Sequence, residues 1–296
     1  MYHDGELEVQ KRAGVVALAA QVGRSIRNFI PPSAMSFLAM QKLAVAASVA
    51  GDGHVWASAL VGERGFLSAP DPQRLRIGIA PRAGDPLWTN LENHAAIGVL
   101  ILDPATRRRM RVNGRAQATD REILVQTEQV YSNCPKYIQQ RAPEEFNREA
   151  EERRVVRSAQ LSFLQQEFIA RSDTFFLATA HSVNGADASH RGGMPGFARV
   201  LEPGKLLWPD YPGNNMFQSL GNLKINPRAG LLFMDFARGS TLQLSGKAQV
   251  IWNSERMAEF PGAQRLIEFT VSEVLESEAA FDARWRLLEY SPVNPR

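Results

Sequence analysis

The sequence has 296 residues, of which 44% are apolar and 22% charged, so it has the composition of an ordinary globular protein of about two domains. A single cysteine excludes an internal disulfide, and a net charge of +3 does not predict a nucleic-acid partner. No apolar run reaches the ~18 residues of a membrane span, and the first residues lack the pattern of a signal peptide. We therefore expect a cytoplasmic protein with no membrane or nucleic-acid partner and no metal site.

The first half of the chain predicts short strands and one helix. Apolar, β-prone runs of strand length occur at Leu43–Val49, Leu75–Ile79, Ala96–Leu102 and Met110–Ala116. A helical stretch, Pro86–Asn93, lies between the second and third of these runs. Several short strands with one helix are typical of a small barrel.

Residues 119–170 contain helix-start signals and pairs of opposite charges at helical spacing. Thr119 and Asp120 are good N-cap residues, and Glu122 follows Thr119 at capping-box spacing. We therefore expect a solvated helical connector over 119–162. Cys134-Pro135-Lys136 predicts a helix start within it, where the thiol would be either a small packed residue or a group with a lowered pKa.

The second half repeats the pattern of the first. The segment Gly98–Gln117 aligns with Gly230–Gln249 at a shift of 132 positions, with matched glycines and aspartates. The repeated elements are strands at Thr174–Ala180, Lys205–Trp208, Ala229–Met234 and Leu242–Val250, with a helix over Asn215–Ile225. The sequence therefore predicts two tandem barrels that form a pseudo-dimer within one chain. The expected domains are 1–118 with a leading helix, the connector 119–162, and 163–296.

Polar groups are unequally shared between the two copies. Ser189-His190-Arg191-Gly192 of the second copy aligns with Ser58-Ala59-Leu60-Val61 of the first, which lacks the imidazole and the guanidinium. Hydroxyl, imidazole and guanidinium groups beside glycine amides suit a phosphate or another anion, although a flexible hairpin is an equal alternative. Asn214 or Asn215 can cap the following helix, whose N-terminus also attracts anions.

The second copy resembles the flavin-binding split-barrel family related to pyridoxamine 5'-phosphate oxidase. The resemblance covers most of 163–252 and, more weakly, 37–117. The matching blocks are Phe175-Phe176-Leu177-Ala178-Thr179, Ser189-His190-Arg191-Gly192-Gly193, Gly204-Lys205-Leu206-Leu207-Trp208, Gly213-Asn214-Asn215, Asn226-Pro227-Arg228-Ala229-Gly230-Leu231-Leu232-Phe233 and Leu242-Gln243-Leu244-Ser245-Gly246-Lys247-Ala248. Gly213-Asn214-Asn215 stands where the oxidase has a Ser-Arg-Lys phosphate clamp, so the resemblance does not extend to pyridoxamine phosphate as the substrate.

The resemblance implies an α+β fold, mainly β, of two split barrels that bind FMN at an interface between barrels. The positions that it implies for the cofactor are Ser189, His190, Arg191, Gly192, Arg199, Trp208, Pro209, Asp210, Asn214 and Asn215. Arg108 and Arg109 of the first copy align with Ser240 and Thr241, near the position where the oxidase has an Arg-Gln pair. Arg109 or Arg111 is therefore expected to reach the cofactor or a substrate anion from the other barrel, the alternative being a solvated basic strand edge.

The expected function is that of an FMN-dependent oxidoreductase acting on an unidentified small molecule. The electron donor, for which NAD(P)H is one candidate, would bind transiently because the chain has no Gly-x-Gly-x-x-Gly motif. Two alternatives stay open: a non-enzymatic flavin-binding or sensing module, and a deazaflavin- or haem-binding protein on the same barrel. Whether two chains pair further stays open as well.

Overall fold

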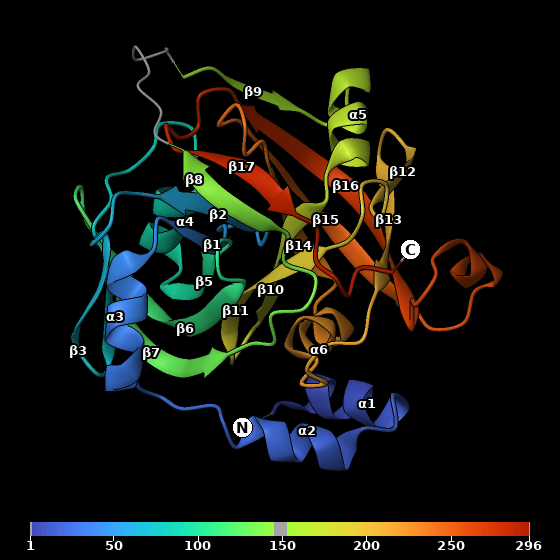
Figure 1. Cartoon of the computed structure of the whole chain (residues 1–296), viewed down its shortest axis with the longest axis horizontal. Coiled ribbons are helices and arrows are strands. Elements are labelled where there is room, and N and C mark those ends of the chain that lie inside the picture. The colour runs from blue at the N-terminus through green and yellow to red at the C-terminus, as the bar shows by residue number, and fades with distance from the viewer. Residues whose placement is uncertain (1, 145–152, 296) are drawn as a thin grey trace.

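The computed structural model describes residues 2–144 and 153–295, which form two β-barrels side by side (Figure 1). The first barrel has seven antiparallel strands in the order β2-β1-β5-β6-β7-β4-β3. Their bounds are β1 Leu43–Val49, β2 Val55–Val61, β3 Leu67–Asp71, β4 Arg74–Ile77, β5 Ala96–Asp103, β6 Arg108–Ala118 and β7 Ile123–Ser132. The helix α4 (Leu87–Asn93) lies between β4 and β5 in the chain.

The second barrel repeats this arrangement strand for strand. Its order is β11-β10-β14-β15-β16-β13-β12, with the short β9 (Val155–Ser158) added to β16. The bounds are β10 Thr174–His181, β11 Gly185–Gly192, β12 Arg199–Glu202, β13 Lys205–Asp210, β14 Arg228–Met234, β15 Thr241–Ile251 and β16 Arg265–Ser277, with α6 (Gln218–Ile225) before β14. The predicted mainly β fold of two tandem barrels is confirmed.

Two matched glycines allow the barrels to pack closely. A Cβ atom on Gly98 of β5 would lie 2.5 Å from the carbonyl oxygen of Ala186, and one on Gly230 of β14 would lie 2.5 Å from that of Val55. Neither contact leaves room for a side chain. The two glycines that the sequence alignment pairs therefore perform the same task from opposite sides of the barrel interface.

Three large apolar clusters stabilise this arrangement. One fills the first barrel around Leu75 and Ile101, and another fills the second around Trp208 and Phe233. The third lies between the barrels and combines residues of β1, β2 and β5 with residues of β10, β11 and β14. Burial of apolar surface there holds the two barrels in a fixed relation.

The predicted helical connector is wrong. Residues 123–132 form β7, which pairs with β4 and β6 and completes the first barrel, and β8 (Gln140–Glu144) pairs with β17 (Arg284–Glu289). Thr119 and Glu122 form a turn between β6 and β7, because the Thr119 hydroxyl accepts from the Glu122 amide. Residues 133–139 contain no helix, so Cys134 does not begin one, and residues 145–152 of the predicted connector lie outside the described part of the chain.

The remaining helices cover the ends of the barrels. The helices α1 (Asp4–Arg12) and α2 (Val16–Gly23) lie below α6 in Figure 1, so the leading helix packs against the second barrel. The helix α3 (Pro32–Met40) covers the first barrel and α5 (Phe163–Arg171) precedes the second. Within the described ranges, no helix has the length and apolar character needed to cross a bilayer. The domain bounds drawn from the sequence stay a prediction.

Candidate functional site

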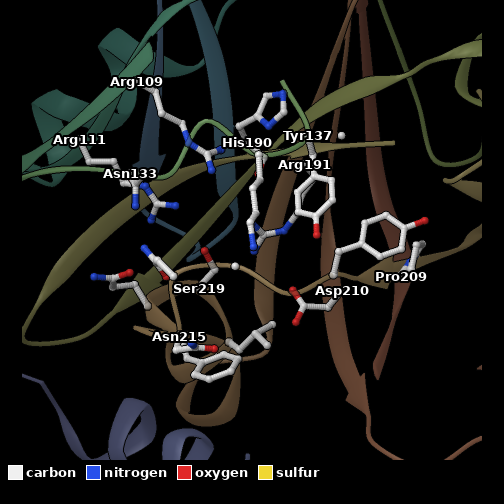
Figure 2. A pocket seen from close by; sticks show the side chains of 18 of the residues that line it. Arg109, Arg111, Asn133, Tyr137, His190, Arg191, Pro209, Asp210, Asn215 and Ser219 are labelled. Atoms are coloured by element: carbon white, nitrogen blue, oxygen red, sulfur yellow. The ribbon is translucent and has the colours of Figure 1, made fainter. Parts of the chain in front are cut away.

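A cavity opens where β6 and the segment after β7 face β11, β13 and the start of α6 (Figure 2). We call it the interface cavity, and it has about 770 Å³ of empty space counted to its open mouth. Its lining residues come from both barrels and are Arg109, Arg111, Asn133, Lys136, Tyr137, His190, Arg191, Gly192, Phe197, Pro209, Asp210, Tyr211, Gly213, Asn214, Asn215, Phe217, Gln218, Ser219 and Leu220.

Most of the predicted site residues meet here. His190, Arg191, Gly192, Pro209, Asp210, Asn214 and Asn215 of the second barrel lie around the same space as Arg109 and Arg111 of the first. Alternation along β6 directs Arg109 and Arg111 to the same face of the strand, because successive strand residues point to opposite faces. Figure 2 shows the guanidinium groups of Arg109, Arg111 and Arg191 pointing into the space between the barrels.

Three predicted residues do not line the interface cavity. Trp208 is fully buried in the core of the second barrel, where its ring packs edge-on against Phe175 at 5.2 Å between centroids. Arg199 lies on β12, at the edge of the sheet, and its guanidinium donates to Glu259 of the 3-10 helix η1 (Glu255–Glu259) at 2.6 Å. Ser189 lies behind the cavity wall, where its hydroxyl accepts from the Ser219 hydroxyl at 3.0 Å.

Arg111 connects the two barrels through Asp187 of β11. Its Nη1 lies 2.9 Å from both carboxylate oxygens of Asp187, which also accepts from the Tyr131 and Ser219 hydroxyls and from the Asn113 amide. Burial works to lower the pKa of Arg111, but the Asp187 carboxylate outweighs it and raises that pKa above its ordinary value. Asp187 therefore accepts from Arg111 and from three further donors, and it forms no hydrogen bond with Arg109 or Arg191.

Among the residues that the structure describes, no carboxylate contacts Arg109 or Arg191 in this way. Burial, together with the guanidinium groups of Arg111 and Arg191, lowers the pKa of Arg109 to about 9. Burial also lowers the pKa of Arg191, and the carboxylate of Asp210 offsets this only in part. Asp210 is the one carboxylate among the described lining residues, facing three arginines and Lys136. The cavity is therefore strongly cationic and suited to an anionic ligand.

Several buried polar atoms at the cavity wall have no hydrogen-bond partner among the described residues. These atoms are the Nε of Arg109, Arg111 and Arg191, the Nε2 of His190 and the Oδ1 of Asn133. Buried polar atoms are almost always paired in folded proteins, so a cluster of unpaired ones at a cavity favours a ligand as their partner. Four of these atoms are nitrogens, which favours a ligand rich in acceptor oxygens. The Oδ1 of Asn133 is an acceptor for an N–H group of that ligand.

The environment of His190 favours its neutral form. The residue is 4% exposed, and burial followed by the nearby arginines Arg109 and Arg191 lowers its pKa well below the ordinary value. A neutral imidazole offers one donor and one acceptor nitrogen, so His190 adds a hydrogen-bonding group without adding charge.

The start of α6 adds a further anion-attracting feature. The helix begins at Gln218, not at Asn215, because Asn215 and Phe217 have left-handed backbone angles, with φ of 61° and 62°. Asn214 is not a helix cap: its Oδ1 accepts from the Met216 amide in the preceding turn, at 3.1 Å. Since no side chain caps α6, its first N–H groups and the positive end of its dipole are left for another partner beside Ser219.

The segment after β7 contributes residues that the sequence did not assign to the site. Asn133, Lys136 and Tyr137 line the cavity, and the Tyr137 ring lies 5.2 Å from that of Tyr211. The Tyr137 hydroxyl donates to the Pro212 carbonyl at 3.1 Å, which connects this segment to the second barrel. Cys134 is half-buried and does not line the cavity.

The equivalent place on the opposite side of the molecule is filled by side chains. By the repeat, Trp56 matches Asp187 and Gln243 matches Arg111 of the interface cavity region. Gln243 donates to the Ala57 carbonyl at 2.9 Å. Arg82 extends through this region and donates to the carbonyls of Ala280 and Val61 at 2.6 and 2.8 Å. The asymmetry noted in the sequence therefore corresponds to one open, cationic interface and one filled with protein groups.

The fold and the interface cavity define a two-barrel protein with a cation-lined site between its barrels. Residues 164–285 match the family model described as pyridoxamine 5'-phosphate oxidase. The resemblance found in the sequence is thereby confirmed for the second barrel. No curated protein matches the chain.

Several solved structures are similar to one barrel of the chain. A HupZ variant from Group A Streptococcus is 10% identical, with a TM-score of 0.33 over 39% of this chain and 98% of that one. A FAD-binding protein from Mesorhizobium loti is 14% identical, with a TM-score of 0.30 over 42% and 98%. A Clostridium acetobutylicum protein of the pyridoxinephosphate oxidase family is 13% identical, with a TM-score of 0.29 over 41% and 90%. At these scores the similarities carry no argument about function.

Proposed function

We propose that the interface cavity binds FMN and that the chain is a flavin-dependent oxidoreductase. The observation that carries the proposal is the set of three arginine side chains, from both barrels, whose buried Nε atoms have no partner at one cavity. A phosphate monoester provides the charge and the acceptor oxygens that these groups need. The match of residues 164–285 to the pyridoxamine 5'-phosphate oxidase family model supports a flavin as the phosphate's carrier.

The residues present fit such a cofactor. Arg109 and Arg191 would hold the phosphate together with the uncapped start of α6, while Arg111 stays paired with Asp187. Asn133 and the neutral His190 would supply an acceptor and a further polar contact, and Tyr137 an aromatic wall. When bound, the flavin supplies the hydride and electron chemistry itself. The chain's own contribution is to bind and orient it and to keep it in a cationic setting.

The phosphate assignment is tested by comparing FMN with riboflavin, which lacks the phosphate. We expect the protein to bind FMN about 10- to 100-fold more tightly than riboflavin, the size of one or two charge-assisted hydrogen bonds. Arg109→Thr installs the residue that the second barrel carries at the matching position, Thr241, and should remove most of this preference. Arg115→Thr, on the same strand but exposed and outside the cavity, is the control.

Equal affinity for FMN and riboflavin, or an FMN preference that survives Arg109→Thr, would refute this use of the arginines. Catalysis is tested separately by adding NADH or NADPH to the FMN-loaded protein without oxygen. Bleaching of the flavin absorption supports an oxidoreductase that uses a nicotinamide donor. Retention of the colour with both donors would favour a flavin-binding module or a different donor.

A further inference from the structure

A second cavity adjoins the interface cavity and shares Arg109 and Asn133 with it. We call it the side cavity. It lies between the start of α3, the start of β6 and the end of β7, with about 1190 Å³ of empty space counted to its open mouth. Because two lining residues are common to both cavities, a ligand in one would lie next to a ligand in the other.

The side cavity is cationic and has an apolar wall. Arg27, Arg107, Arg108 and Arg109 line it, and its described lining contains no carboxylate. Arg107 is engaged with Glu289 at 2.7 Å, and Arg109 is directed at the interface cavity, which leaves Arg27 and Arg108 to act on the side cavity. The guanidinium carbon of Arg108 lies 4.9 Å from the centre of the Phe37 ring, and Met110 and Val130 extend the apolar surface.

The start of α3 strengthens the attraction for an anion. Ser33 and Ala34, in the first turn of this nine-residue helix, line the cavity, and no side chain caps the helix. The uncapped N–H groups and the helix dipole therefore add positive potential to that of the arginines.

The second barrel provides an internal comparison. Its counterpart cavity uses Leu164, Gln165 and Phe168 of α5 where the side cavity uses Ser33, Ala34 and Phe37 of α3. In place of Arg108 and Arg109 the counterpart has Ser240 and Thr241, and its cationic groups are accompanied by carboxylates. Those carboxylates are Asp235, Glu276 and Glu278. The same fold therefore forms without the two arginines, so folding does not explain their presence in the side cavity.

We propose that the side cavity binds a small organic anion, a carboxylate with an aromatic or aliphatic body. The carboxylate would pair with Arg108, and the body would pack on Phe37 and Met110. Arginine suits this role because its planar guanidinium matches a carboxylate with two parallel hydrogen bonds. That this anion is the reaction partner of the flavin rests on the proposed function, whereas its binding does not.

The test uses benzoate as the probe and benzamide as its uncharged counterpart, each titrated calorimetrically into the full-length protein. We expect benzoate to bind at least ~10-fold more tightly than benzamide, the effect of a charge-assisted pair. Arg108→Ser, which installs the residue found at position 240, should weaken benzoate binding about tenfold and leave benzamide unchanged. Arg115→Ser, exposed on the same strand, should change neither.

Equal binding of benzoate and benzamide, or an Arg108→Ser variant that binds benzoate as well as Arg115→Ser does, would overturn the proposal, and so would the absence of benzoate binding. Titrations with and without saturating FMN separate this proposal from the flavin assignment. A protein that binds benzoate but no flavin retains the anion site and loses the proposed function. A protein that binds FMN but not benzoate retains the flavin assignment and overturns the anion site in the side cavity.

Discussion

Arg111 on β6 of the first barrel donates to both carboxylate oxygens of Asp187 on β11 of the second, at 2.9 Å each, and both side chains are buried. The pair fixes the two barrels beside the interface cavity. No carboxylate of the described residues contacts Arg109 or Arg191, so their charge is directed at the cavity. One ion pair thus stabilises the interface while two arginines remain for a ligand.

Removing one member of this pair should destabilise the protein strongly. Arg111→Gln, the residue at position 243 of the second barrel, leaves the Asp187 carboxylate buried without its cation. We expect the free energy of unfolding to fall by about 3–5 kcal/mol, measured by urea denaturation. Arg115→Gln, an exposed position of the same strand, is the control, and a loss below about 1 kcal/mol for Arg111→Gln would contradict the role of the pair.

Arg191→Leu should have opposite effects on stability and on ligand binding. Leucine stands at the matching position of the first barrel, Leu60, and removing a buried cation that lacks a carboxylate contact removes a desolvation cost. For the protein without ligand, the free energy of unfolding in urea should therefore rise by about 1 kcal/mol, while the affinity for FMN falls about 10- to 100-fold. A variant of lower stability and unchanged FMN affinity would show that Arg191 is structural.

Gly221→Ala should detach α1 from α6. An added Cβ would lie 2.5–2.7 Å from the Cγ and backbone atoms of Glu6. A Cβ added to the facing Gly5 would likewise clash with the Gly221 carbonyl oxygen. We expect a loss of about 1–3 kcal/mol in thermal or urea unfolding, the usual cost of overpacking. Gly204→Ala is the matched control because no atom lies within 4 Å of its added Cβ. Equal stability of the two variants would contradict the close helix contact.

The docking of α1 should also depend on pH through Glu6. Burial raises the pKa of Glu6 from 4.5 to about 7, and the hydrogen bond from the His3 amide offsets this only in part. Between these pH values the folded state binds more protons than the unfolded state, so stability is highest at low pH and is lost as the pH rises toward 7. The expected loss is about 3 kcal/mol, at roughly 1.4 kcal/mol per pKa unit.

The measurement is urea unfolding at several pH values between 4.5 and 8, for the native chain and for Glu6→Gln. His3 acts in the opposite sense, since burial lowers its pKa and penalises the folded state only at low pH. The difference between the two proteins isolates Glu6, because both retain His3. Identical pH profiles would show that the Glu6 carboxyl does not titrate in this way.

Much of the fold could be predicted because apolar runs and matched glycines mark the strands twice. The run Leu43–Val49 coincides with β1, and the helix predicted over Pro86–Asn93 differs from α4 by one residue. The sequence does not predict β7 because its counterpart in the second barrel, β16, follows a longer loop that contains η1, so the constant shift of the repeat breaks there. Without that repeat, the polar residues of β7 predict a solvated helix.

The site residues that the sequence predicts lie in segments that can be aligned between the two copies. The residues that it does not predict lie outside that alignment. The loss of His190 and Arg191 in the first copy marked the cationic wall. Trp208 was misplaced because a strand residue next to Pro209 can face either side, and here it faces the core. Asn133 and Tyr137 reach the cavity only through the path of the chain after β7, which no local pattern reveals.

The most direct measurement of the central claim is the visible absorption spectrum of the purified protein before and after addition of FMN and gel filtration. Our account predicts flavin absorption that elutes with the protein, at about one flavin per chain, since the equivalent opposite interface is filled by Arg82 and its neighbours. A protein that elutes colourless after incubation with FMN would contradict the assignment of the interface cavity.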